Sequence, residues 1–243
     1  MTGRRLPAAV LLLLAMAPGS ARAALSDSDI QTLVEVSLRD KKISGVQVSV
    51  RDAVVTLSGM VPSAWARGRA LELALKPEDV KSLVVDDLRV ARGESDAKVG
   101  EEVARRVRHY VLYSIFDDVN LSVQDGVVTL TGRVTQGFKV RDIEDVAAQV
   151  FGVQEVRNEL QLLPVSIADD QLRNAIASQL YRDPLFQSYA FQVNPPIHIV
   201  VENSRVTLTG AVANAVERTK AEMIARSTFG VMGVENRLQV ERP

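Results

Sequence analysis

Thr129-Leu130-Thr131-Gly132-Arg133-Val134 decides the fold of this chain, because the same hexapeptide pattern stands at two other places. The other copies are Thr56-Leu57-Ser58-Gly59-Met60-Val61 and Thr207-Leu208-Thr209-Gly210-Ala211-Val212. Their glycines lie 73 and 78 residues apart, which is the length of a small structural unit. The sequence therefore predicts one unit that is repeated three times.

An alternating pattern precedes each hexapeptide, as expected of a strand with one buried face. A turn separates the two, at Asp125-Gly126 in the second copy and at Arg51-Asp52-Ala53 and Glu202-Asn203-Ser204 in the others. Each copy therefore predicts a β-hairpin that ends in the glycine. The apolar residues of the first strands are Val46, Val48 and Val50, then Val119, Leu121 and Val123, then Ile197, Ile199 and Val201.

Helical periodicity frames each hairpin, with apolar residues spaced to form one stripe. In the third copy, Asn214 and Glu217 form a capping signal at the start of the second helix, and Pro77 ends the corresponding helix of the first copy. We expect two helices per unit. The stripes before the hairpins are Ile30, Leu33, Val34 and Leu38; Val99, Val103, Val107 and Val111; and Leu172, Ile176 and Leu180. Those after them are Leu71, Ala74 and Leu75; Ile143, Val146, Ala147 and Val150; and Val216, Met223 and Ile224.

A third strand closes each unit. Gly152-Val153 and Gly230-Val231 precede it in two copies, whereas the first has Val80-Lys81 there and is the degenerate copy. The expected fold class is α+β, with three tandem α-β-β-α-β units at 24–93, 95–164 and 167–243, each a small three-stranded mixed sheet packed on two helices. Short linkers, at Ala91–Ser95 and Pro164–Ala168, favour units that pack on one another. The apolar residues of the third strands are Val84, Leu88 and Val90; Val156, Leu160 and Leu162; and Val234, Leu238 and Val240.

Residues 1–23 read as a secretory signal peptide. Arg4 and Arg5 precede an apolar run that is too short to span a bilayer, and Ala21-Arg22-Ala23 matches a cleavage site. Twin-arginine export, an uncleaved anchor and a buried helix are the alternatives. No cysteine follows, which argues against a lipoprotein. Cleavage after Ala23 would leave a net charge of -4 and would place the chain in the periplasm.

The composition is that of an ordinary globular protein, with 47% hydrophobic and 24% charged residues among 243. The absence of cysteine excludes zinc fingers, iron–sulfur clusters and thiol catalysis. A net charge of -1 argues against nucleic acid as the partner.

The repeated pattern resembles the BON domain (bacterial OsmY and nodulation). The resemblance rests on Thr-Leu-(Ser/Thr)-Gly-x-Val after a hairpin, followed by a helix and a third strand that carries Asn158 or Asn236. It implies periplasmic or envelope-associated binding modules that contact phospholipid membranes or envelope proteins and protect against envelope or osmotic stress. It implies no enzymatic activity and no cofactor. The motif glycines are interpreted as part of the fold: Gly59, Gly126, Gly132, Gly152, Gly210 and Gly230.

Two stretches are candidates for lipid or partner contact. The first is a basic helix end with the aromatic residues after it, and it could lie against anionic headgroups. Its alternative is a solvated face paired with Glu101 and Glu102. The second is a cluster of aromatic residues, whose alternative is an internal lid or a surface packed against a neighbouring repeat. The residues are Arg105, Arg106, Arg108, Tyr110, Tyr113 and Phe116 in the first, and Tyr181, Phe186, Tyr189 and Phe191 in the second.

Catalytic and metal sites have little support in the sequence. His109 and His198 lack partners at ligand spacing, and the paired acids Asp86-Asp87, Asp117-Asp118 and Asp169-Asp170 read as loop or helix-terminus charges. We therefore expect no catalytic residue, no metal and no cofactor. The leading hypothesis is a non-catalytic module that attaches to an anionic membrane surface or an envelope protein. The alternatives are a chaperone-like protein-binding adaptor in the periplasm and, third, an enzyme. The sequence leaves the oligomeric state open.

Overall fold

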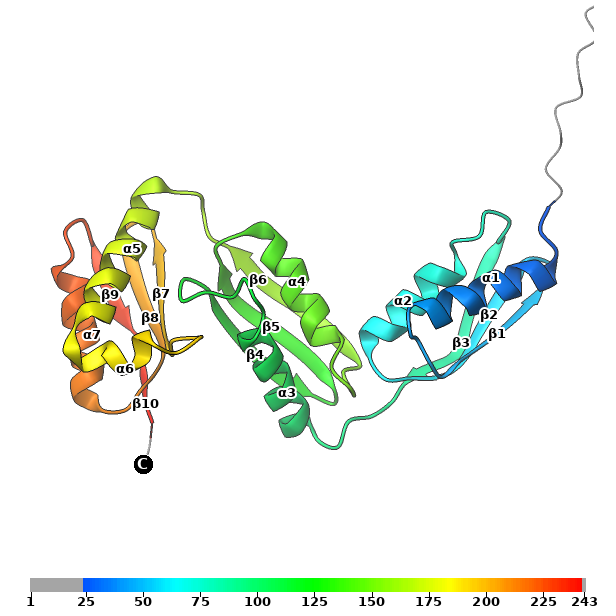
Figure 1. Cartoon of the computed structure of the whole chain (residues 1–243), viewed down its shortest axis with the longest axis horizontal. Coiled ribbons are helices and arrows are strands. Elements are labelled where there is room, and N and C mark those ends of the chain that lie inside the picture. Colours follow the sequence, from blue (N-terminus) through cyan, green and yellow to red (C-terminus); the bar gives the residue numbers. More distant parts are fainter. Residues whose placement is uncertain (1–23, 242–243) are drawn as a thin grey trace, which may run out of the picture.

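The computed structural model describes residues 24–241, so the predicted signal peptide lies outside the described residues. Figure 1 shows three units in a row, in chain order, each with its helices on one face of its sheet. The α-β-β-α-β order predicted for every unit is confirmed. The first unit consists of α1 (Asp27–Asp40), β1 (Val46–Arg51), β2 (Val54–Val61), α2 (Ala64–Ala74) and β3 (Ser82–Val90).

The second unit repeats this order with the same strand pairing. Its elements are α3 (Asp96–Arg108), β4 (Asp118–Gln124), β5 (Val127–Val134), α4 (Gly137–Ala148) and β6 (Glu155–Leu162). In both units the first two strands are antiparallel and the third runs parallel to the second, with the hexapeptide strand in the centre. The predicted three-stranded mixed sheet is confirmed for these two units.

The third unit departs from the pattern in two places. A short insertion, η1 (Pro184–Phe186) and α6 (Gln187–Ala190), follows α5 (Ile167–Arg182) and accounts for the longer second spacing. The third strand is broken into β9 (Gly233–Asn236) and β10 (Gln239–Val240), and both pieces pair in parallel with the central strand. The remaining elements are β7 (Ile197–Glu202), β8 (Arg205–Val212) and α7 (Ala215–Ser227).

The hexapeptide glycine is required by the backbone. Gly59, Gly132 and Gly210 have φ between +102° and +116°, a region that side chains disfavour. An added Cβ at Gly132 would lie 2.1 Å from the carbonyl oxygen of Asp118 on the neighbouring strand. The repeated glycine therefore lets the edge strand approach the central one.

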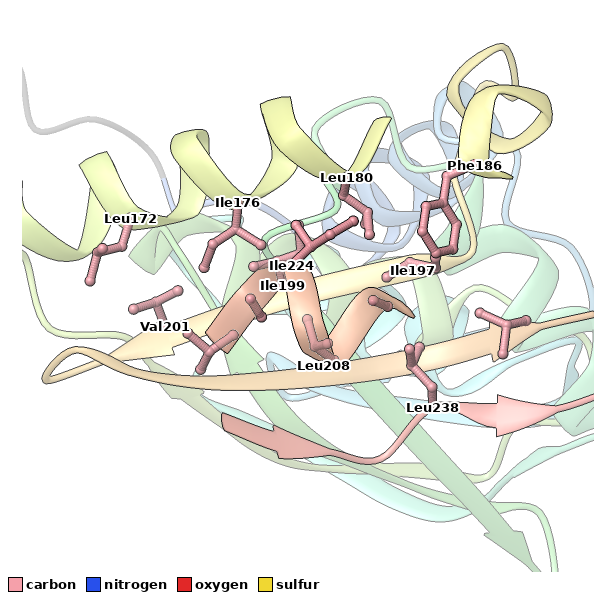
Figure 2. Close-up of a cluster of buried hydrophobic side chains, with 14 residues drawn as sticks. Leu172, Ile176, Leu180, Phe186, Ile197, Ile199, Val201, Leu208, Ile224 and Leu238 are labelled. Atoms are coloured by element: carbon pink, nitrogen blue, oxygen red, sulfur yellow. The ribbon is translucent and has the colours of Figure 1, made fainter. Parts of the chain in front are cut away.

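Each unit has its own hydrophobic core between helices and sheet. Figure 2 shows the core of the third unit, where residues of α5 and Phe186 of η1 face the strands. The prediction of buried helix stripes is wrong at five residues, which are exposed: Leu33, Leu75, Val111, Val216 and Met223. Two residues predicted to be buried at strand ends, Leu162 and Val240, are exposed as well. Val111 is exposed because α3 ends at Arg108, and alanines such as Ala70 and Ala221 occupy core positions instead.

The units contact one another in two different ways. Between the first and second, the amide of Gly152 donates to the carbonyl of Pro62 at 3.0 Å and the amide of Ala64 donates to Val153 at 2.8 Å. Between the second and third, the outer faces of the two sheets meet. Thr209 Oγ1 donates to Asp118 Oδ1 at 2.9 Å, and the amide of Ile199 donates to the carbonyl of Ile115 at 2.7 Å. The prediction of units packed on one another is confirmed.

Candidate interaction surface

Two arginines at the basic end of α3 share one acid. Arg105 Nη2 lies 2.6 Å from Glu102 Oε1, and Arg106 Nε lies 2.8 Å from the same oxygen. These contacts, first from Arg105 and then from Arg106, lower the pKa of Glu102 to about 2. Arg108 is exposed and forms no ion pair within residues 24–241. Glu102 offsets one of the two charges of Arg105 and Arg106, and within the described residues Arg108 is the predicted arginine that has no ion pair of its own.

The aromatic residues after α3 turn toward neighbouring elements. Tyr110 Oη donates to a carboxylate oxygen of Asp142 on α4. The Tyr113 ring lies 5.3 Å from the ring of His198 in the third unit, and burial raises the pKa of the Tyr113 hydroxyl. Phe116 packs against the core of the third unit. Tyr110 therefore contacts α4 of its own unit, whereas Tyr113 and Phe116 contact the third unit.

The predicted aromatic cluster is mostly an internal lid, which is the alternative that the sequence left open. Phe186 is fully buried, so it cannot serve as a surface contact. Tyr181 Oη donates to the carbonyl of Ile197 at 2.9 Å, and Tyr189 Oη donates to Glu217 Oε2 at 2.6 Å. Phe191 differs from the others, because 88% of it is exposed.

The two candidate stretches, far apart in sequence, meet at the junction of the second and third units. The side-chain amide of Asn194 donates to the carbonyl of Arg108. A cleft of about 820 Å³ lies there, and Arg108, Tyr113, Gln192 and His198 are among the residues that line it. Sequence periodicity gave no sign of this meeting, because only the packing of the two sheets creates it.

Exposed apolar side chains stand close in sequence to residues that line this cleft. Val111 is 91% exposed and Val193 is 96% exposed, next to Phe191 on the same segment. We define the junction surface as Arg105, Arg108, Val111, Leu112, Phe191 and Val193. Val193 belongs to none of the predicted strands or helix stripes, and Val111 was predicted to lie in a buried stripe. An apolar residue outside every stripe is the signal that could have revealed Val193.

His198 closes the cleft on its inner side. Its Nδ1 lies 2.6 Å from the carbonyl oxygen of Asp117, so this nitrogen carries the proton and donates it. Burial lowers the pKa of His198, although the Asp117 carbonyl and the charges of Asp118 and Asp117 act in the opposite direction. The other histidine, His109, caps the C-terminus of α3 and contacts the carbonyl of Arg105 through Nδ1.

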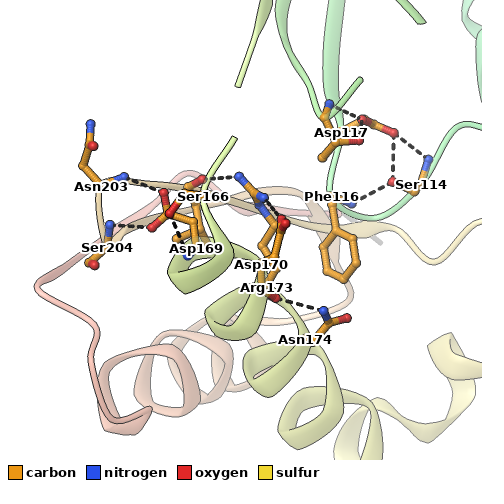
Figure 3. A network of polar contacts seen from close by, with 12 residues as sticks. Ser114, Phe116, Asp117, Ser166, Asp169, Asp170, Arg173, Asn174, Asn203 and Ser204 are labelled. Atoms are coloured by element: carbon orange, nitrogen blue, oxygen red, sulfur yellow. Dashed lines mark hydrogen bonds and ion pairs between the residues drawn. The ribbon is translucent and has the colours of Figure 1, made fainter. Parts of the chain in front are cut away.

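The acids of the pairs Asp117-Asp118 and Asp169-Asp170 each bind structural partners of their own. Asp117 is buried and accepts from Lys139 Nζ at 2.7 Å. Burial alone would raise the pKa of Asp117, but Lys139, the amide of Thr135 and Ser114 together hold it below its ordinary value. Figure 3 shows Asp169 accepting the amides of the hairpin turn, and Asp170 pairs with Arg173. Residues 24–241 contain no group of three potential metal ligands from histidine, aspartate and glutamate.

The motif residues of the late strands serve the fold. Asn158 Nδ2 donates to the carbonyl of Val140 at 2.8 Å, and Asn236 Nδ2 donates to the carbonyl of Arg218 at 2.9 Å. Each asparagine thereby ties the third strand of its unit to the second helix. None of the helices within the described range has the length and apolar character needed to cross a membrane.

The chain is similar to a characterised bacterial protein in sequence and has weak similarity to solved structures. The chain is 29% identical over 147 residues to osmotically-inducible protein Y of Escherichia coli (strain K12), covering 56% of this chain and 73% of that protein. Among solved structures it is similar to the C-terminal domain of CdsD, a type III secretion protein of Chlamydia trachomatis, with 15% identity and a TM-score of 0.25 over 90% of this chain and all of that one.

A periplasmic domain of PrgH from S. typhimurium has 14% identity and a TM-score of 0.22 over 86% of this chain and all of that one. Scores this low carry no information on function. The model of the BON domain matches residues 26–92, 95–164 and 168–242, which together make up most of the chain. The chain therefore belongs to the BON domain family, with three tandem copies of the domain.

Proposed function

We propose that this chain is a non-catalytic protein of the bacterial envelope that attaches peripherally to anionic phospholipid through the junction surface. The observation that carries the proposal is that Val111, Phe191 and Val193, all nearly fully exposed, lie within three residues of the contact between Arg108 and Asn194. Grouped exposed apolar side chains are typical of interaction sites. A basic residue beside them favours an anionic partner.

Each side chain of the junction surface is expected to contribute a modest part of the binding free energy. Burying one large apolar side chain in the acyl boundary contributes about 1.5–3 kcal/mol. A basic residue near an anionic surface contributes about 1 kcal/mol. Arg105 contributes less than Arg108, because Glu102 already pairs with it. The proposal therefore predicts weak, reversible attachment in which the apolar side chains supply most of the free energy.

An envelope location rests on independent observations. Residues 1–23 have the pattern of an export signal, and cysteine is absent from the chain. Membership of the BON family and the similarity to osmotically-inducible protein Y support a role in envelope or osmotic stress. A non-catalytic role is supported by the acids at the unit junctions, since Asp117 and Asp118 already serve structural hydrogen bonds.

Co-sedimentation with vesicles tests this proposal. The chain from Ala24 onward is mixed with vesicles of phosphatidylglycerol and cardiolipin, and separately with neutral phosphatidylcholine. We expect binding to the anionic vesicles at low salt, weakened but not abolished by high salt, because screening acts only on the charged part. Absence of binding to the anionic vesicles at low salt would reject the lipid proposal.

Matched variants locate the surface. Phe191→Ser with Val193→Ser should reduce the bound fraction severalfold, and Arg108→Glu should reduce it and remove most of the salt dependence. Met223→Ser is the control, because Met223 is also an exposed apolar residue of the third unit but lies on α7, outside the junction surface. Equal loss in the control would show that the junction surface is not the binding site.

A protein partner is the second candidate function. Of the predicted aromatic cluster, Phe191 is well exposed, and it belongs to the junction surface. If vesicles are not bound, crosslinking in envelope extracts should capture a partner that is lost with Phe191→Ser and retained with Met223→Ser. That result would favour an adaptor over a membrane-attached module.

A further inference from the structure

The contact between the first and second units is built from two small parts. One is the loop between α4 and β6, residues 151–154, which we call the docking loop. The other is the receiving edge, which comprises residues 62–64 and Ala91. Gly152 and Val153 exchange backbone hydrogen bonds with Pro62 and Ala64, and Gln154 Nε2 donates to the carbonyl of Ala91 at 2.8 Å.

The third unit carries a second docking loop of the same shape, residues 229–232. Val153 donates to the carbonyl of Val150 at 3.2 Å, and Val231 donates to Thr228 at the same distance. Gly152 has φ of +86° and Gly230 has φ of +94°. In both units the next residue, Gln154 or Met232, donates its amide to a carbonyl of the hairpin turn at 2.9 Å. The two loops therefore share one conformation.

This second docking loop has no partner in the part of the chain that the structure describes. The amide of Gly230 and the carbonyl of Val231 make no hydrogen bond there, although Gly152 and Val153 use the same groups against the first unit. Phe229 is 99% exposed and Met232 is 79% exposed. The loop therefore presents free backbone groups between two solvated apolar side chains.

The second unit carries a free receiving edge. By their distance from the hexapeptide glycine, Thr135 and Gly137 correspond to Pro62 and Ala64. Within residues 24–241, neither the Thr135 carbonyl nor the Gly137 amide, at the start of α4, takes part in a hydrogen bond. Phe138 stands at the position of Trp65, which lines the cleft between the first and second units. Phe138, Leu162 and Val165 are exposed around this edge.

The third unit's own edge is a poorer receiver. It has Val216 at the aromatic position, and Tyr189 Oη already accepts from the amide of Ala213 beside it. The occupant best matched to the free docking loop is therefore the edge at Thr135–Gly137, which lies on the preceding unit of the same sequence.

We propose that the docking loop of the third unit, Phe229 to Met232, binds the receiving edge at Thr135–Gly137 of a second copy of this chain. Inside one chain the linker raises the effective concentration of the two parts, so few contacts suffice. Between two chains no linker raises the effective concentration. The contact then depends on apolar area, which Phe229 and Met232 supply on one side and Phe138, Leu162 and Val165 on the other. Because the two surfaces differ, the contact is heterologous and builds a ring or an open chain.

Site-directed crosslinking tests this arrangement, and the absence of native cysteine makes it clean. The single variants Met232→Cys and Val165→Cys are mixed and treated with a short bis-maleimide. We expect a covalent dimer in the mixture and much less with either variant alone. The matched control replaces Val165→Cys by Val193→Cys, since both valines are 96% exposed. A yield no greater than in the control would overturn the proposal.

Sedimentation velocity over a wide range of concentration gives a second readout. The unmodified chain should form species larger than a monomer as concentration rises, and Phe229→Ser with Met232→Ser should remain a monomer. Both side chains are exposed, so folding should be unchanged by circular dichroism. A monomer at every concentration would contradict the inference. Phe191→Ser should lose vesicle binding yet still assemble, which separates this proposal from the membrane proposal.

Discussion

The carboxylate of Asp169, near the start of α5, accepts the backbone amide of Ser204 in the β7–β8 turn at 2.8 Å. Its other oxygen accepts the amide of Asn203 at 2.9 Å. The same arrangement recurs in the other units, where Asp27 and Asp96 each accept two amides of their own hairpin turn. One carboxylate per unit therefore fixes the opening helix against the hairpin.

Removing this carboxylate should lower the free energy of unfolding most in the unit where the carboxylate is buried. Asp169 is buried, whereas Asp96 is exposed and water can replace it. Asp169→Ala leaves two amides without an acceptor and should lower the free energy of unfolding by about 1–3 kcal/mol. Asp96→Ala should cost less. Urea unfolding measures both, and equal costs would contradict the role of burial.

The hexapeptide glycine should not tolerate a side chain. In Gly132→Ala, the new Cβ would clash with the carbonyl of Asp118, and φ of +116° would be strained. We expect the second unit to unfold or to lose several degrees of thermal stability. Gly68→Ala is the control, because nothing lies within 4 Å of its Cβ and it sits inside α2. That change should raise stability by about 0.5–1 kcal/mol.

Periodicity and the repeated hexapeptide were sufficient to predict the three units, because both depend on contacts within one unit. They did not predict which side of a helix lies closest to the sheet, so Val216 and Met223 were placed in a core that Ala221 and Ala225 fill. The sequence patterns also did not predict the junction surface. Arg108 and Asn194 come together only because the outer faces of two sheets pack, and no local pattern encodes that contact.

The buried ion pair of the second unit should be costly to break. Lys139→Met leaves the Asp117 carboxylate without its cation and should destabilise the protein by about 3–5 kcal/mol at neutral pH. With burial now dominant, the pKa of Asp117 should rise, so the cost should shrink as acid protonates the carboxyl. Urea unfolding at two pH values measures this. Lys220→Met breaks the more exposed pair with Asp183 and should cost less than about 1 kcal/mol.

Phe116 should couple the second unit to the third. It belongs to the second unit by sequence but packs against the third unit's core. Phe116→Ala should therefore speed hydrogen exchange in α5 and β7, at a cost of roughly 2 kcal/mol because Phe116 is only partly buried. Phe138→Ala, at an exposed position of the same unit, should leave those elements unchanged. Faster exchange confined to the second unit would show that the junction carries little coupling.

His198 should make the junction of the second and third units sensitive to acid. Burial lowers its pKa below the ordinary value of 6.5, so the unfolded chain binds a proton more readily than the folded one. The stability contributed by neutral His198 is therefore present above pH 6.5 and is lost as the pH falls from there toward the folded pKa. His198→Asn keeps a donor for the Asp117 carbonyl but cannot titrate, so between pH 8 and pH 5 it should lose less stability than the unmodified chain. Urea midpoints at the two pH values measure this, since other titrating groups contribute equally to both proteins. An equal loss would mean that His198 has the same pKa in the folded chain as in the unfolded one, as a solvated histidine would.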